Sequence, residues 1–289
     1  MNSMKAAPIE KSEVRRGWCF VAPALLWTLA FFVVPFAFMA AASFASRVSR
    51  QIVYTWDLGN YVNFFSKSYL LKGLFVSLEI TLLVTVISVL LAYPLAWIIA
   101  ERVPKRWQRT ALILAILPFW TSYVVRSYSW LLVLSSNGVI NNLLLKFGLQ
   151  EPLELASTTT ATVIGFVHFF VMLLTLTIYS NLVQLSPNYK RAAQDLGANG
   201  LQTFWHVILP LTLPGIMVGA FLTFVLCIGD YITPQILGGN NELVLPQIIM
   251  LQLGRRADIP TAAALSIVLM LVVTLAYILC LRWLKMERT

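Results

Sequence analysis

The stretch SPNYKRAAQDLGANGLQTFWHVILPLTLPGI, residues 186–216, decides the fold, because it is a long polar interval between two apolar runs and has the pattern of a helix pair. Ser186 and Pro187 are typical of a helix start: the hydroxyl accepts a hydrogen bond from a first-turn amide, and proline has no amide to leave unpaired there. Gly197 and Gly200 are expected to end this helix. The stretch therefore predicts a folded connection between two spans, shaped to contact something else.

The first helix is expected to present small apolar side chains on one face, with Ala192, Ala193 and Leu196 fitting a shallow groove on a partner. A second short helix is expected over residues 201–208. Pro210 then leads the chain into the next apolar run, since proline is tolerated at the start of a helix.

The composition places the whole chain in a membrane. Of 289 residues, 59% are hydrophobic and only 11% are charged, and the mean hydropathy is +0.79, which is too apolar for a soluble domain. The net charge of +9 does not indicate nucleic acid, because the cations are spread along the chain rather than gathered in one patch. Cys19, Cys227 and Cys280 lie in apolar runs without metal-binding spacing, so neither a disulfide nor a metal site is expected.

The predicted fold is an all-α integral membrane protein with six transmembrane helices. The expected spans are 18–42, 73–100, 110–134, 160–185, 207–232 and 261–284. A cleaved signal peptide is the alternative for the first run, but at roughly 25 residues the run is longer than an apolar signal region of about 7 to 15. Short helices are expected in the loops at 43–71, 135–157 and near 244–253.

Lysine and arginine counts predict the orientation. The amino terminus, the 101–109 turn, the 186–206 loop and the carboxyl tail carry 13 of these cations, and the other loops carry 7. Because cytoplasmic loops carry the excess of Lys and Arg, both termini and the 186–206 loop are expected in the cytoplasm. The first group includes Lys5 and Arg288, and the second includes Arg50.

Four ionisable residues fall inside the expected spans, all toward the outer side: Glu79, Arg126, His168 and Asp230. Charge in hydrocarbon is costly and usually faces a bundle interior or water. For Glu79 and Arg126, a structural ion pair and a transport role are both open, and for His168 a hydrogen-bonded core position is favoured. Asp230, at a helix break, is the preferred pathway residue, because interrupted backbone at membrane depth normally lines a cavity.

Aromatic residues near the third span have two interpretations. Trp120 and Tyr123 are typical of an interfacial belt, and their rings are also able to hold an ammonium group through cation–π attraction. The candidate substrate pathway therefore comprises Asp230, Glu79, Trp120, Tyr123, Arg126 and Tyr231.

Several motifs together give the chain a family resemblance. They are YPLAW (93–97), LPFWTS (117–122), NGVINNLLL (137–145), AAQDLGAN (192–199), LPLTLPGI (209–216) and GDYITPQILGG (229–239). The chain resembles the permeases of spermidine/putrescine-type ABC importers, over roughly residues 73–281. The 186–206 loop resembles the coupling (EAA) loop of that superfamily, which sits in a cleft of the ATPase subunit.

The resemblance implies a type I ABC importer permease fold with a cytoplasmic coupling helix in a bacterial inner membrane. By position, Ala192, Ala193, Gly197, Ile208, Leu209 and Pro210 match the family pattern. The full set expected to couple to the ATPase also includes Tyr189, Arg191, Asp195 and Leu196. Arg191 stands where the family usually has glutamate, and Asp195, one turn on, is placed to pair with it. The chain is divided into 1–72 (terminus, first span and outer loop), 73–285 (permease core) and 286–289 (tail).

The resemblance also implies the partners: two ATP-binding subunits that hold ATP and magnesium, a second permease subunit in a heterodimeric pore, a periplasmic binding protein and the lipid bilayer. No cofactor is expected on this chain, which lacks the GxxxxGK[ST] phosphate loop, and no nucleic acid is expected as a partner. Other small amines, opines and aminophosphonates remain open as cargo.

Two other classes of protein are disfavoured. A secondary transporter would be expected to show inverted repeats, and an intramembrane enzyme would need a convergent catalytic set; neither pattern is found in the sequence. No catalytic residue is therefore assigned.

Overall fold

The computed structural model describes residues 11–48, 51–148, 150–239 and 243–286. Within these ranges the chain is almost entirely helical, with one two-stranded antiparallel hairpin. Lys5, Arg50 and Arg288, which entered the cation count, lie outside the described residues, as do residues 287–289 of the expected tail.

The longer helices are α1 (Lys11–Thr28), α4 (Ser68–Trp97), α5 (Lys105–Ile116), α6 (Tyr123–Leu134), α8 (Thr159–Gln184), α11 (Leu209–Ile228) and α14 (Ile259–Met286). The shorter helices are α2 (Val34–Ser43), α3 (Gly59–Ser66), α7 (Val139–Lys146), α9 (Pro187–Asp195), α10 (Gly200–Thr203), α12 (Ile232–Leu237) and α13 (Leu245–Leu251). Tighter or wider turns extend them: η1 (Leu29–Val33), η2 (Ile98–Arg102), η3 (Leu117–Trp120), η4 (Phe204–Ile208) and η5 (Gln252–Arg256). The hairpin consists of β1 (Ser46–Val48) and β2 (Gln51–Val53).

Among the residues that the structure describes, five helices are long and apolar enough to cross a membrane, and a sixth span exists only if a bent helix pair is counted as one. That pair, Lys105–Trp120 with Tyr123–Lys146, is bent by 89°. The prediction of a continuous third span over 110–134 is therefore wrong. The helix breaks where Pro118 opens a 3₁₀ turn and Thr121 adopts an extended backbone, since proline removes an amide from the helical ladder.

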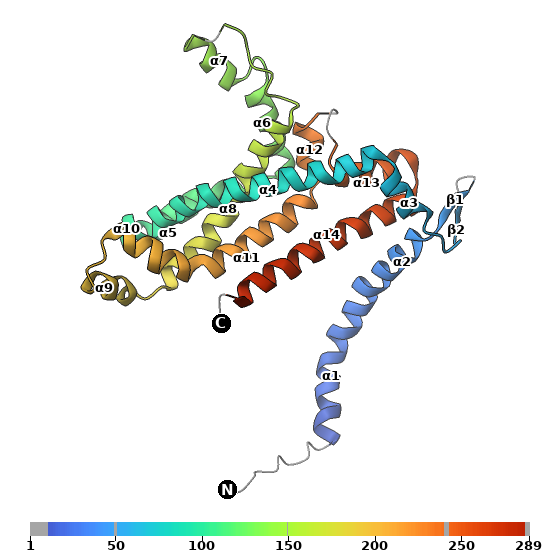
Figure 1. Cartoon of the computed structure of the whole chain (residues 1–289), viewed down its shortest axis with the longest axis horizontal. Coiled ribbons are helices and arrows are strands. Elements are labelled where there is room, and N and C mark those ends of the chain that lie inside the picture. Colours follow the sequence, from blue (N-terminus) through green and yellow to red (C-terminus); the bar gives the residue numbers. More distant parts are fainter. Residues whose placement is uncertain (1–10, 49–50, 149, 240–242, 287–289) are drawn as a thin grey trace.

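The body is a bundle in which α8 packs against both α4 and α11, and α11 also packs against α4 (Figure 1). Gly215 and Gly219 of α11 permit its close approach to α8: a Cβ on Gly215 would lie 2.3 Å from the side chain of Asn181, and one on Gly219 would lie 2.9 Å from Leu174. Small residues at such crossings are typical of membrane helices. α2 contacts α14, whereas α1 extends away from the body.

The predicted fourth span is confirmed, and its start is capped: the Ala161 amide donates to the hydroxyl of Thr158 at 3.2 Å. The fifth span begins earlier than predicted. The expected second short helix of the 186–216 stretch, α10 and η4, continues without a loop into α11, so that Gly200–Ile228 forms one apolar helix. The expected loop helices appear as α3, α7 and α13, whereas the β1–β2 hairpin and α12 were not predicted.

Candidate functional site

The helix expected to couple to an ATPase is α9, and its ends form as the sequence predicts. The hydroxyl of Ser186 accepts from the amide of Asn188 at 3.3 Å, and Pro187 occupies the first turn. Gly197 has φ +86°, and its amide donates to the Gln194 carbonyl at 2.9 Å. Since only glycine adopts this left-handed backbone at little cost, Gly197 terminates α9 as expected. Gly200 does not end a helix; it begins α10.

The predicted shared face of Ala192, Ala193 and Leu196 is wrong. Ala193 is only 8% exposed and packs inward, whereas Ala192 is exposed and Leu196 is 89% exposed. Adjacent helical residues are turned about 100° apart, so Ala192 and Ala193 cannot point the same way. The outward ridge instead comprises Tyr189, Ala192 and Leu196, at the i, i+3, i+7 spacing of one helix face.

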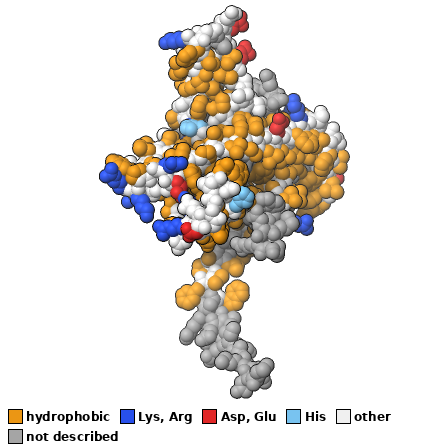
Figure 2. Space-filling model, turned by 60° about the vertical axis from the view of Figure 1, so that its left-hand side comes forward, with side chains coloured by type: hydrophobic (Ala, Val, Ile, Leu, Met, Phe, Trp, Pro, Cys, Tyr) orange, Lys and Arg blue, Asp and Glu red, His pale blue; other side chains and the backbone are white. Residues whose placement is uncertain are grey.

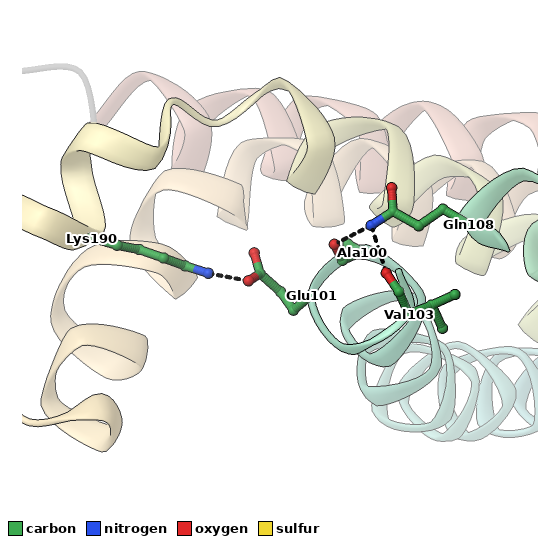
Figure 3. A network of polar contacts seen from close by, with 5 residues as sticks. All are labelled: Ala100, Glu101, Val103, Gln108 and Lys190. Atoms are coloured by element: carbon green, nitrogen blue, oxygen red, sulfur yellow. Dashed lines mark hydrogen bonds and ion pairs between the residues drawn. The ribbon is translucent and has the colours of Figure 1, made fainter. Parts of the chain in front are cut away.

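The expected pairing of Arg191 with Asp195 does not occur among the residues that the structure describes. The neighbouring Lys190 forms an ion pair with Glu101 of η2 (Figure 3). Its Nζ atom also lies 5.0 Å from the ring centroid of Trp97. These contacts join α9 to the carboxyl end of α4. Glu101 is the single acid in the basic 101–109 turn, and that isolation is the sequence signal that could have indicated a distant cationic partner.

An aromatic cluster lies beside this ion pair. The ring of Phe204 stands edge-on to those of Tyr93 and Trp97, at 5.7 and 5.3 Å. Ile208 is buried in the same core, Leu209 packs against it, and Pro210 lies in the first turn of α11. Within the predicted coupling set, therefore, Ile208 and Leu209 contribute packing that ties η4 to α4 and α8.

The 101–109 turn is held by one amide side chain. The Nε2 atom of Gln108 donates to the carbonyls of Ala100 and Val103, at 2.8 and 3.1 Å (Figure 3). Between this turn and the start of α9 lies a cavity of about 680 Å³, which we name the inner cavity. The turn, the end of α8 and the entry to α11 also line it.

At the other end of the body, Asp230 forms a compact polar cluster. Its carboxylate accepts from the Tyr123 hydroxyl, from the Ile232 amide at 2.8 Å and from the Thr233 amide at 3.4 Å. The hydroxyls of Tyr123 and Thr233 also share a hydrogen bond. Asp230 thus caps the start of α12 and ties it to α6. Thr233 was missed by the sequence reasoning, although Asp230 is a residue type that caps helix starts and so indicates that its carboxylate accepts from amides two or three residues later.

The adjoining space is small. A cavity of about 10 Å³ lies next to Asp230, and Ser77, Phe166 and Cys227 are among the residues that line it. This volume admits a single water at most.

Arg126 is buried, at 7% exposure, and no carboxylate in the described part of the chain pairs with it. Its Nη1 atom donates to the Pro118 carbonyl at 3.0 Å, and its guanidinium lies 4.8 Å from the ring centroid of Phe169 and 5.3 Å from that of Tyr123. Among the described residues Glu79 is exposed and forms no ion pair with Arg126, so the ion-pair interpretation is wrong. Arg126 instead fastens the broken third span to α8.

The remaining pathway candidates are dispersed. Trp120 is 83% exposed and does not share a surface with Tyr123, whose ring stands edge-on to that of Phe169. Tyr231 is half-buried beside Asp230. His168 accepts from the indole N–H of Trp130 at 2.9 Å, which confirms the hydrogen-bonded interpretation of this histidine. The structure therefore brings together Tyr123, Arg126 and Asp230, and leaves Glu79 and Trp120 outside that cluster.

Known proteins resemble this chain along most of its length. Residues 22–285 match a family described as the binding-protein-dependent transport system inner membrane component. The spermidine/putrescine transport system permease protein PotB of Escherichia coli (strain K12) is 33% identical over 251 residues, which cover 86% of this chain and 90% of that protein. The inner membrane ABC transporter permease protein YdcU of the same strain is 34% identical over 212 residues, covering 69% and 67%.

Solved structures share the fold. A chain of a bacterial alginate ABC transporter, in complex with an alginate pentasaccharide-bound periplasmic protein, superposes with a TM-score of 0.74 at 18% identity, covering 93% of this chain and 94% of that one. A chain of the MetNI methionine ABC transporter superposes with a TM-score of 0.59 at 15% identity, covering 76% and 96%. These likenesses establish the type I importer permease architecture, with five or six spans.

Proposed function

The chain belongs to the inner-membrane components of binding-protein-dependent transport systems, and we propose that it forms half of the pathway by which an ABC importer takes up a polyamine. It is a multi-pass inner-membrane permease and not the ATPase of its transporter. The observation that carries the polyamine proposal is the 33% identity to PotB, a spermidine/putrescine permease, over 86% of this chain.

The proposed assembly contains two ATP-binding subunits, a second permease and a periplasmic binding protein, with ATP and magnesium held by the ATP-binding subunits. Both termini, and with them α9, lie in the cytoplasm in this proposal. The exposed ridge of Tyr189, Ala192 and Leu196 supports a contact between α9 and an ATP-binding subunit, because an exposed apolar face on a polar helix marks an interaction site. The ridge would occupy the ATPase cleft, and Gly197 would set the angle at which the chain leaves it.

The pathway role of Asp230 is also part of the proposal. A fixed carboxylate lowers the cost of moving an ammonium group out of water. Asp230 lies at a helix interruption, between the end of α11 and the start of α12, where such a group would enter. Its hydrogen bonds to Tyr123 and to α12 satisfy most of its acceptor capacity, so cargo would have to compete for it or displace Tyr123.

The test is co-purification followed by transport. The chain is isolated in mild detergent and its partners are identified. The complex is then reconstituted in liposomes in a defined orientation, with the binding protein on the periplasmic side of the complex. We expect ATP-dependent uptake of radiolabelled spermidine or putrescine. An excess of about 100-fold of an opine or an aminophosphonate should not lower this uptake. Uptake of an opine in preference to spermidine would reject the polyamine assignment and leave the family unchanged.

A further inference from the structure

The inner cavity has features that neither the coupling role nor the pathway role uses. With a volume of about 680 Å³, it falls in the size range of sites that bind small ligands. It lies where α4 ends through η2, where α5 begins and where α8 ends, which places it at the level of one membrane surface. A ligand at this depth meets both the head-group region and the edge of the hydrocarbon core.

The polar side of the inner cavity is basic. Arg102, Lys105 and Lys190 contribute three cations, against the single carboxylate of Glu101. Glu101 is already paired with Lys190, as Figure 3 shows. Among the described residues, Arg102 and Lys105 have no acidic partner, so the cavity retains two uncompensated positive charges. In Figure 2, Lys and Arg side chains gather on one side of the body.

The other side of the inner cavity is apolar. Leu182, Val183, Ile208 and Leu211 line it. Val183 is 53% exposed, and Leu211 is also exposed, so this wall continues onto the outer surface of the helices, where a membrane protein meets lipid. A soluble anion would contact only the basic side of the cavity, whereas an amphiphile with an anionic head group would contact both the basic side and the apolar wall.

We propose that the inner cavity binds an anionic phospholipid of the cytoplasmic leaflet, with Arg102 and Lys105 holding the phosphate and the wall of α8 and α11 receiving the upper part of an acyl chain. Basic pockets between spans on the cytoplasmic side bind anionic head groups in this manner. The lipid would brace the 101–109 turn against the start of α9, beside the Lys190–Glu101 ion pair. This inference rests on the proposed function only through the cytoplasmic orientation.

The test measures lipid retention by the intact transporter complex. The complex is placed in nanodiscs containing phosphatidylglycerol or phosphatidylcholine, then released and weighed by native mass spectrometry. We expect retained phosphatidylglycerol and little phosphatidylcholine. The double variant Arg102→Gln/Lys105→Gln should lower retention about 30-fold, since each basic residue near the surface contributes about fivefold to the affinity.

A matched control comes from the same turn and helix. Arg106→Gln/Arg109→Gln removes the same charge from residues that do not line the inner cavity, and it should change retention by less than about threefold. Equal loss in the two double variants would show general surface attraction and overturn the proposal. If the cavity variant fails to assemble, Lys105→Gln alone is measured, with about a fivefold loss expected; unchanged retention in that variant also overturns it.

Two further arms identify the occupant. Inorganic phosphate and glycerophosphoglycerol, which lack acyl chains, should not displace the lipid; displacement by either would make the site one for a soluble anion. If the intact complex retains no phosphatidylglycerol while the permease subunits freed of the ATPase retain it, the cavity belongs to the ATPase contact instead and the proposal is overturned. Retention is scored without any transport assay, so failure to transport polyamines leaves this result standing. Labelling of the 101–109 turn from the periplasmic side would reject the leaflet assignment.

Discussion

The two ends of the bundle handle their polar groups in opposite ways. At the end that holds α12, Tyr123, Asp230 and Thr233 form hydrogen bonds with one another, and Arg126 is enclosed by a carbonyl and two rings. At the end that holds α9, an exposed apolar ridge remains, and the described residues show an ion pair between α9 and the turn after α4. The difference teaches that the first cluster holds this chain together, whereas the α9 end leaves an apolar surface uncovered. Substitutions at the two ends should therefore have separable effects.

The largest effect is expected for Gly197→Leu. No atom lies within 4 Å of a Cβ placed there, so the substitution acts only through the backbone, whose φ of +86° is unfavourable for leucine. A cost of about 1–2 kcal/mol at the turn after α9 should change its angle and lower uptake per ATP hydrolysed by about tenfold. Uptake and ATPase activity are measured together in liposomes.

Gly200→Leu is the matched control for this turn. Gly200 also has open space around it but lies in the first turn of α10 and has no positive φ. It should transport at nearly the parent rate. If both variants lose coupling equally, size rather than backbone angle is responsible, and the role assigned to Gly197 is wrong.

A smaller effect is expected when the Lys190–Glu101 ion pair is reversed. Lys190→Glu places two carboxylates together and removes the cation from Trp97, so uptake per ATP should fall about fivefold, corresponding to about 1 kcal/mol for a partly exposed pair. The double variant Lys190→Glu/Glu101→Lys should recover most of the loss. Arg106→Glu, at an exposed position outside the coupling set and without an ion pair among the described residues, serves as control; absence of rescue by the double variant would reject the contact as a link to α4.

The smallest effect is expected for Asp230→Asn. Asparagine caps a helix about as well as aspartate, so α12 should remain in place while the charge is lost. Because the carboxylate is already occupied by Tyr123, uptake of a cationic cargo should fall only about threefold, with assembly and basal ATP hydrolysis unchanged. Normal uptake in Asp230→Asn together with loss in Glu79→Gln would move the entrance to Glu79.

The sequence was sufficient for the long helices and for the ends of α9, because both depend on local chemistry. Long apolar runs predict spans, and Ser186, Pro187 and Gly197 specify a helix start and stop through their own backbone preferences. The break of the third span was missed because apolar residues occur on both sides of Pro118, and hydropathy carries no information on the direction of the helix axis.

Contacts between distant segments were the other failure. Nothing near Glu101 identifies Lys190 as its partner, and nothing near Asp230 identifies Tyr123. Such pairs depend on how α4, α6, α9 and α12 are placed by packing, which a single sequence does not encode locally. Ala192 and Ala193 are both small, but successive residues of a helix point about 100° apart, so one is exposed and the other is buried.

The unbroken helix from Gly200 to Ile228 has a mechanical consequence. Its 29 residues make a rod of roughly 43 Å, since each residue advances about 1.5 Å along the axis. One end leaves the Gly197 turn, and the other stops just before Asp230. A tilt of only about three degrees at the turn would move the far tip by roughly 2 Å over that length, comparable to the reach of a hydrogen bond. Small displacements at the Gly197 turn are thus large enough, by leverage alone, to separate Asp230 from Tyr123.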